Sequence, residues 1–142
     1  MDNLIIDLKR TDERVHFECV SSLHPEQSVP FDYVPPLGTG VGFSGLEMLL
    51  TSFCGCVSTA VIGLLLRAGK HVTSYSVHAE GVRSEQPLSL SKILFQINIS
   101  SLDVSGDDMS LILRQAEQIS PVWIAVRNNI EIDVSCDIQS PQ

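Results

Sequence analysis

The stretch that decides the fold covers residues 45–66 and reads GLEMLLTSFCGCVSTAVIGLLL. It carries no charge between Glu47 and Arg67, and Cys54 and Cys56 stand near its centre. Three kinds of helix fit such a sequence: a membrane span, the core helix of a soluble domain, and a helix that carries a reactive thiol. The rest of the chain has to distinguish among them.

A membrane span is the weakest of the three interpretations. Residues 48–66 are 19 uncharged residues, about the minimum that crosses a bilayer. Hydroxyl-bearing side chains interrupt this run, and the remainder of the chain alternates between apolar and polar residues as soluble sheets do. We therefore expect no membrane partner and favour a buried core helix.

Both ends of this helix carry recognisable signals. Ser44 stands three residues before Glu47, the spacing of a capping box at a helix start. Gly69 is a typical residue just past a helix end, and the charge of Lys70 suits the negative end of the helix dipole. The pattern predicts a helix over residues 44–68.

The other segments predict an α+β fold in a single domain of residues 1–142. Four prolines in the region before the helix indicate a loop there, with one edge strand at most. The expected elements are a hairpin of strands 3–10 and 14–21, a loop over 24–45 with an edge strand at 29–33, strands 74–83 and 92–101, helices 105–119 and 120–128, and a closing strand 130–138.

Composition excludes several functional classes. The net charge of −8 and the pI near 4.7 argue against a nucleic-acid partner, which requires a basic surface. The histidines and cysteines lack the spacing of metal ligands, so we expect neither metal nor cofactor. The first residues lack the pattern of a signal peptide, and the four cysteines show no disulfide pattern, so we expect a cytoplasmic location.

Three segments resemble the OsmC/Ohr superfamily: SGLEMLLTSFCGC at 44–56, HAEGVRSEQPLSLSKILFQINISS at 78–101, and AEQISPVWIAVRNNIEIDV at 116–134. The resemblance covers residues 31–138. It implies antiparallel sheets around a long buried central helix, in an intertwined homodimer. Many members of that superfamily reduce organic hydroperoxides with a pair of cysteines, at sites built between the subunits.

The resemblance also assigns positions in the helix and beyond. It places Cys56 at the peroxide-attacking cysteine, Leu46 at a glutamate of the family's peroxidases, and Ser120 at the resolving cysteine, where "SPV" stands for "CPV". Glu47 precedes Cys56 by nine residues, which puts it on the opposite face of a straight helix. Glu47 is therefore interpreted as a capping residue, although it is also a candidate for the pocket.

Cys56 needs a cation if it is to attack as a thiolate, because it lies about three turns into the helix, beyond the reach of the helix dipole. The resemblance implies an arginine from the N-terminal region, for which Arg10 and Arg14 are the candidates by position. Asp32 and Tyr33, in the loop before the helix, are candidates for a pocket entrance.

Each of these residues also has a purely structural interpretation. Cys56 could be a small core residue, Ser120 the N-cap of a helix that starts at Pro121, and the two arginines ordinary hairpin charges. Cys19 and Cys136 alternate with apolar neighbours in strands and are expected in the core.

Small residues recur along the helix, at Thr51, Gly55, Thr59 and Gly63. Glycine costs about 1 kcal/mol relative to alanine inside a helix, so two of them indicate close packing of another element. With the resemblance, this row predicts the core of a homodimer.

Two functions follow from different classes. The first is a stress-response protein that reduces organic hydroperoxides through Cys56 by a one-cysteine route, in which an external thiol reduces the sulfenic acid. The second is a non-enzymatic module that binds a small hydrophobic molecule at the dimer interface.

Overall fold

The structure is a computed structural model that describes all residues, 1–142. The chain forms two compact units, Met1–Met48 and Leu49–Gln142. Each unit is described separately below, while the expectation of a single domain stays a prediction.

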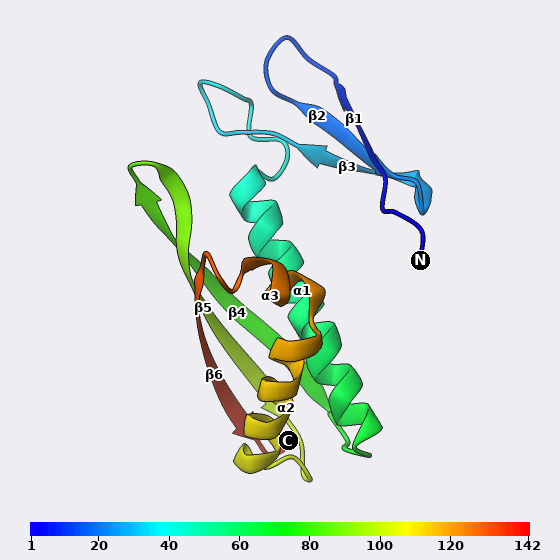
Figure 1. Cartoon of the computed structure of the whole chain (residues 1–142), viewed down its shortest axis with the longest axis vertical. Helices are drawn as coiled ribbons and strands as arrows, with labels where there is room; N and C mark the ends of the chain where they lie inside the picture. Colours follow the sequence, from blue (N-terminus) through cyan, green and yellow to red (C-terminus); the bar gives the residue numbers. More distant parts are fainter. The chain divides into compact units, whose positions relative to one another are not determined.

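The first unit is a three-stranded antiparallel sheet in the order β1-β2-β3 (Figure 1). Its strands are β1 (Ile6–Arg10), β2 (Phe17–Ser21) and β3 (His24–Phe31). The predicted hairpin is confirmed in β1 and β2. Directly opposite residues share a face of a sheet, so the pairs Leu8–Cys19 and Cys19–Val29 form an apolar row across all three strands.

Strand β3 corrects the sequence analysis, which expected a loop from residue 24 with a strand only at 29–33. The strand begins at His24 and ends at Phe31, and it contains Pro25 and Pro30. It lies at the edge of the sheet, where β2 is the only strand that it pairs with, apart from a single bridge between Phe31 and Phe43. An edge strand tolerates proline because only one of its sides must supply N–H donors to a neighbour.

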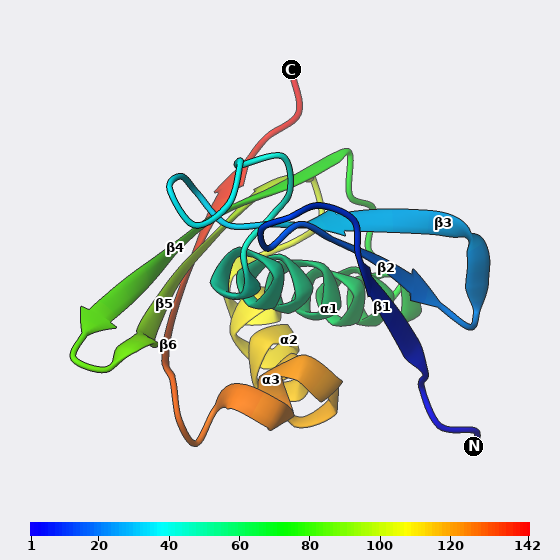
Figure 2. The same cartoon turned by 90° about the horizontal axis from the view of Figure 1, so that it is seen from above.

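The second unit combines a sheet with three helices. The elements are α1 (Gly45–Arg67), whose first turn belongs to the first unit, β4 (Ser74–Glu85), β5 (Leu88–Ser100), α2 (Gly106–Ile119), α3 (Pro121–Val126) and β6 (Glu131–Gln139). The sheet has the order β4-β5-β6, and the three helices lie on one of its faces (Figures 1 and 2). The α+β class and the order of elements are confirmed.

The pairing of β5 with β6 is parallel, whereas antiparallel sheets were expected. Only the pairing of β4 with β5 is antiparallel in this sheet. The reason is the connection: α2 and α3 carry the chain back along the sheet before β6 begins, and a long helical crossover is what joins parallel strands.

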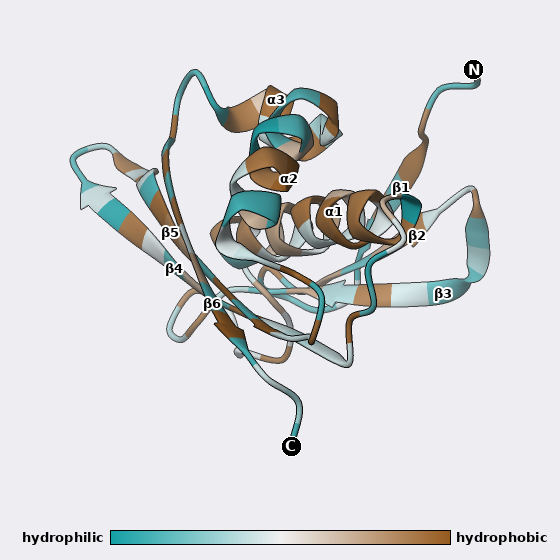
Figure 3. Cartoon of the chain, turned by 90° about the horizontal axis from the view of Figure 1, so that it is seen from below, coloured by the Kyte–Doolittle hydropathy of each residue, from teal (hydrophilic) through white to brown (hydrophobic).

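Helix α1 buries one row of side chains, spaced every four residues: Phe53, Val57, Val61 and Leu65. The row of small residues that includes Gly55 and Gly63 is exposed on the other side. The helix is long and apolar enough to cross a membrane, and Figure 3 shows its hydrophobic colouring along most of its length. Its buried row shows that one face packs within a folded unit, as a core helix does.

Helix α1 ends as the sequence predicts. Gly69 has a positive φ of 74°, and the N–H of Lys70 donates to the carbonyl of Leu65 at 3.0 Å. This is the hydrogen bond of a Schellman motif, which requires a residue that adopts the left-handed conformation cheaply.

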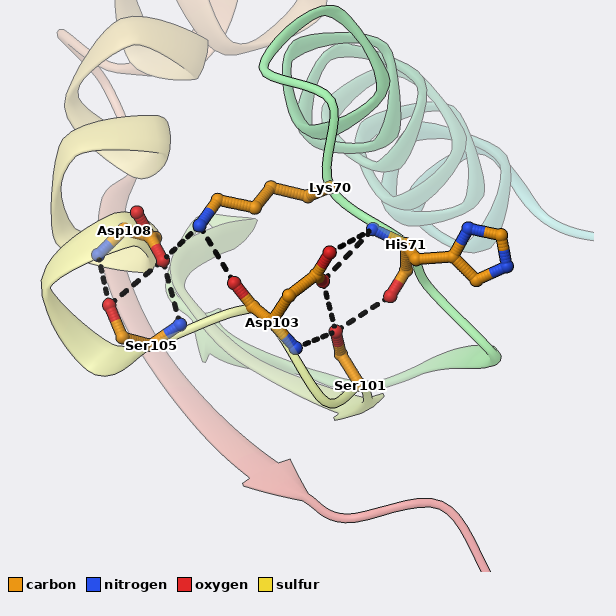
Figure 4. Close-up of polar contacts among 6 residues, drawn as sticks. All are labelled: Lys70, His71, Ser101, Asp103, Ser105 and Asp108. Atoms are coloured by element: carbon orange, nitrogen blue, oxygen red, sulfur yellow. Dashed lines mark hydrogen bonds and ion pairs between the residues drawn. The ribbon is translucent and has the colours of Figure 1, made fainter.

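The sequence analysis expected the charge of Lys70 to act on the helix dipole. In the structure its side chain also connects three segments (Figure 4). Its ammonium donates to the carbonyl of Asp103 at 2.7 Å and to the carboxylate of Asp108 at 2.9 Å. Asp108 also completes the capping box of α2 with Ser105. The Ser105 hydrogen bonds, joined by the Lys70 ammonium, lower the pKa of Asp108 to about 2. This network ties the end of α1 to the start of α2.

Candidate functional site

The central contact of the site joins α1 to the junction of α2 and α3. The hydroxyl of Ser120 donates a hydrogen bond to Sγ of Cys56 at 3.3 Å. The two residues are 64 positions apart in the chain. The structure therefore brings together the two positions that the sequence analysis matched to the attacking and the resolving cysteine.

Ser120 is held rigidly on its side of the contact. It is fully buried, its N–H donates to the carbonyl of Ala116 at 2.8 Å, and its carbonyl accepts from the N–H of Ile124 at 3.0 Å. Ser120 is thereby both the C-cap of α2 and the N-cap of α3. These bonds hold the backbone from which the hydroxyl is directed at Cys56.

The prediction that Ser120 caps α3 is half right. It occupies the N-cap position before Pro121, but its side chain makes no capping hydrogen bond. A serine at an N-cap ordinarily accepts from a backbone N–H of the first turn. Here the hydroxyl is turned to the sulfur of Cys56 instead.

Aromatic rings fix the distance between the two elements. Phe53, one turn before Cys56, meets Trp123, which stands three residues after Ser120, edge to face at a centroid distance of 5.7 Å. Phe53 also packs edge to face on Phe95 of β5 at 5.5 Å. The sequence analysis missed this role, although the only tryptophan of the chain, three residues from Ser120, was a usable signal.

The other two thiols of this unit, Cys54 and Cys136, are also half-buried. Burial raises the pKa of the Cys54 thiol, and burial with the nearby Asp137 raises that of Cys136. Burial also raises the pKa of Tyr75, whose hydroxyl donates to Ser58 at 3.0 Å. A thiol that is harder to ionise is a weaker nucleophile, so burial lowers the reactivity of Cys54 and Cys136.

Asp32 lies in the first unit and organises the loop before α1. Its fully buried carboxylate accepts hydrogen bonds from the N–H groups of Tyr33, Thr39 and Val41 and from the Thr39 hydroxyl, at 2.7–3.2 Å. Burial is the largest influence and opposes its charge, but these bonds together outweigh it and hold the pKa of Asp32 well below its usual range. Asp32 is thus a structural centre of the loop, and Tyr33 is exposed beside it.

The loop also has no room for a side chain at Gly38. A Cβ there would stand 2.1 Å from the carbonyl oxygen of Tyr33 and 2.2 Å from the carboxylate of Asp32. The carbonyl of Gly38 accepts from the guanidinium of Arg14 at 3.2 Å. Arg14 is therefore anchored on this loop, outside its own hairpin.

Arg10 is used within its hairpin. Its guanidinium donates to the carbonyl of Arg14 at 2.7 Å and to that of Glu13. Both arginines belong to the first unit and Cys56 to the second, so the activating role of either one stays a prediction.

Glu47 takes the structural role that its spacing indicates. Its carboxylate accepts from the N–H and from the hydroxyl of Ser44, both at 2.8 Å, and these bonds lower the pKa of Glu47. Glu47 thus satisfies the backbone at the start of α1, which is one half of a capping box. Whether Glu47 also lines a pocket stays a prediction.

Comparison with known proteins identifies a family and a shared fold. The family model described as OsmC-like protein matches residues 38–135. No curated protein matches the sequence significantly.

Solved structures share the fold at low sequence identity. A hypothetical protein from Aquifex aeolicus superposes with a TM-score of 0.83 at 16% identity over the whole of both chains. An OsmC-like protein from Mycoplasma pneumoniae gives 0.78 at 16% identity, with 96% of each chain covered. An organic hydroperoxide resistance protein OsmC from Legionella pneumophila gives 0.75 at 13% identity, with 96% of this chain and 98% of that chain covered.

Proposed function

The chain belongs to the OsmC-like protein family, and we propose that it reduces organic hydroperoxides through Cys56 by a one-cysteine route. The observation that carries the proposal is the 3.3 Å contact between Cys56 and Ser120. A two-cysteine mechanism needs its second sulfur close enough to the first to form a disulfide. At position 120 of this chain the side chain is a hydroxyl instead. The contact supports a reaction site at Cys56 in which residue 120 cannot form an internal disulfide.

The chemistry balances with an external thiol as the reductant. The Cys56 thiolate attacks the peroxide oxygen, so an S–O bond forms, the O–O bond breaks, and the alkoxide takes a proton to leave as an alcohol. An external thiolate then attacks the sulfenic sulfur, forming a mixed disulfide and releasing water. A second thiol attacks that mixed disulfide, which restores the Cys56 thiol and releases an oxidised dithiol or disulfide. A reducing compartment supplies such thiols.

Arg14 is the better candidate than Arg10 for the cation that activates Cys56. The guanidinium of Arg10 is bonded to carbonyls of its own hairpin, whereas Arg14 reaches Gly38 in the loop that leads into α1. In this proposal Asp32 keeps that loop in shape, and Tyr33 lines the entrance for the hydroperoxide. Replacement of Arg14 by alanine should then lower the peroxide reaction more than replacement of Arg10.

We also propose that the protein works as a homodimer. No apolar side chain of the first unit is buried, and Ile6 and Leu8 are 61% and 53% exposed on the apolar face of its sheet. The small-residue row of α1 is exposed as well. Soluble monomers rarely leave an apolar sheet face exposed in this way, so a second copy is the natural cover. Light scattering should give about twice the 15.5 kDa mass of one chain.

Steady-state turnover tests the enzymatic proposal. Cumene hydroperoxide consumption with dithiothreitol should depend on Cys56, so Cys56→Ser should remove it. Cys54→Ser is the matched control, on the same helix and two residues away, and should retain most of the rate. Equal turnover in wild type and Cys56→Ser, or none in wild type, would reject the proposal. In the second case native mass spectrometry for a retained hydrophobic ligand tests the binding alternative.

A further inference from the structure

We propose that the hydroxyl of Ser120 is a hydrogen-bond donor to the reacting sulfur, which stabilises Cys56 in its thiolate form and thereby sets its reactivity. This inference rests on the proposed function of Cys56 and goes beyond it. Ser120, at the position matched to the resolving cysteine, then has a chemical role of its own.

The first support is the pairing of a hydroxyl with the sulfur. A thiolate has no proton to donate, so it only accepts hydrogen bonds, and at 3.3 Å the Ser120 hydroxyl is within reach to donate one to it. Hydrogen bonds to ionised groups are roughly twice as strong as those between neutral groups. The contact therefore strengthens when Cys56 loses its proton, which favours the form that attacks a peroxide.

The second support is the absence of another use for the hydroxyl. Ser120 is fully buried and forgoes the capping bond that its position offers. Its only side-chain hydrogen bond is the one to Cys56. A buried hydroxyl without a partner is costly, so its orientation is set by the sulfur.

The third support is the rigidity of both partners. The backbone of Ser120 is fixed by bonds to Ala116 and Ile124, and the ring contact of Phe53 with Trp123 holds α1 against α3 one turn away. A donor that is held in place before the reaction needs no reorganisation as charge develops, which is the condition for effective electrostatic stabilisation. Tyr75 donates to Ser58 on another part of α1, so it is not a competing donor to Cys56.

The test measures the alkylation rate of Cys56 by iodoacetamide against pH, in a Cys54→Ala background so that each modified peptide is unambiguous. The midpoint of the profile reports thiolate stabilisation, and the plateau at high pH reports access to the sulfur. Ser120→Ala removes one oxygen and should raise the midpoint by about one pH unit, which is about a tenfold lower rate near neutral pH. The alkylation rate on the plateau should stay within about twofold of the wild-type rate, because the thiolate is equally accessible in both proteins.

Two further variants complete the design. Ser120→Thr keeps the hydroxyl and should keep the midpoint near that of wild type, while Ser58→Ala removes a hydroxyl that does not contact Cys56 and should leave the profile unchanged. An unchanged midpoint in Ser120→Ala overturns the inference, as does an equal shift in Ser58→Ala. Alkylation needs no peroxide, so a failure of this inference is distinct from a failure of the proposed function. If wild type shows no hydroperoxide turnover but the midpoint shifts in Ser120→Ala, only the proposed function is rejected.

Discussion

Restoring a sulfur at position 120 should create a disulfide and stabilise the protein. In Ser120→Cys the new thiol replaces an oxygen that already lies 3.3 Å from Sγ of Cys56, so a small side-chain rotation brings the two sulfurs to bonding distance. The bridge would close a loop between residues 64 positions apart. The chain-entropy relation for such a loop gives about 4 kcal/mol. For a chain of this length that corresponds to a rise in Tm of about 12 °C.

The assay compares thermal unfolding of Ser120→Cys after mild oxidation and after reduction, with the bridge located by peptide mass spectrometry. The double variant Ser120→Cys with Cys56→Ser is the control, and it should show no difference between the two conditions. Turnover with a dithiol should also rise in Ser120→Cys, since the sulfenic acid then has an internal thiol to attack it. Recovery of free thiols at both positions after oxidation, or a bridge that lowers Tm, would refute the reasoning.

Two further predictions concern the framework around the site. Trp123→Ala removes the ring that packs on Phe53 and should destabilise the protein by about 3–5 kcal/mol in urea unfolding; a loss below about 1 kcal/mol would contradict the role given to this contact. Asp108 has a folded-state pKa lowered to about 2, so its charge stabilises the fold above its unfolded value of about 3.9, and that contribution is lost as pH falls from about 4 to about 2. Asp108→Asn should therefore unfold more easily than wild type at pH 7, with the difference shrinking towards pH 2; a difference that is constant with pH would contradict this linkage.

Local signals in the sequence predicted most of the elements correctly. The serine and glutamate at the start of α1 and the glycine past its end are read from spacing alone, and the structure confirms both. Alternation and the order of segments likewise predicted the α+β fold. These features depend on residues within a few positions of one another, which is why a single sequence reveals them.

The features that the sequence did not predict depend on distant partners. The prolines of β3 are typical of a loop unless the strand is known to lie at an edge. The parallel pairing of β6 depends on the path of the crossover, and the task of Lys70 depends on Asp108, 38 residues away. Ser120 stands directly before Pro121, as an N-cap residue does, and only its place opposite Cys56 in the structure shows that its hydroxyl contacts the sulfur.

The central claim is that Cys56 is the residue that a hydroperoxide oxidises. The most direct measurement is a single turnover: reduced protein receives one equivalent of cumene hydroperoxide in the presence of dimedone, and peptide mass spectrometry locates the trapped sulfenic acid. Stoichiometric label is expected on Cys56, with little on Cys54 or Cys136 and no internal disulfide. Hydroperoxide left unconsumed, or consumed equally by Cys56→Ser, would contradict it.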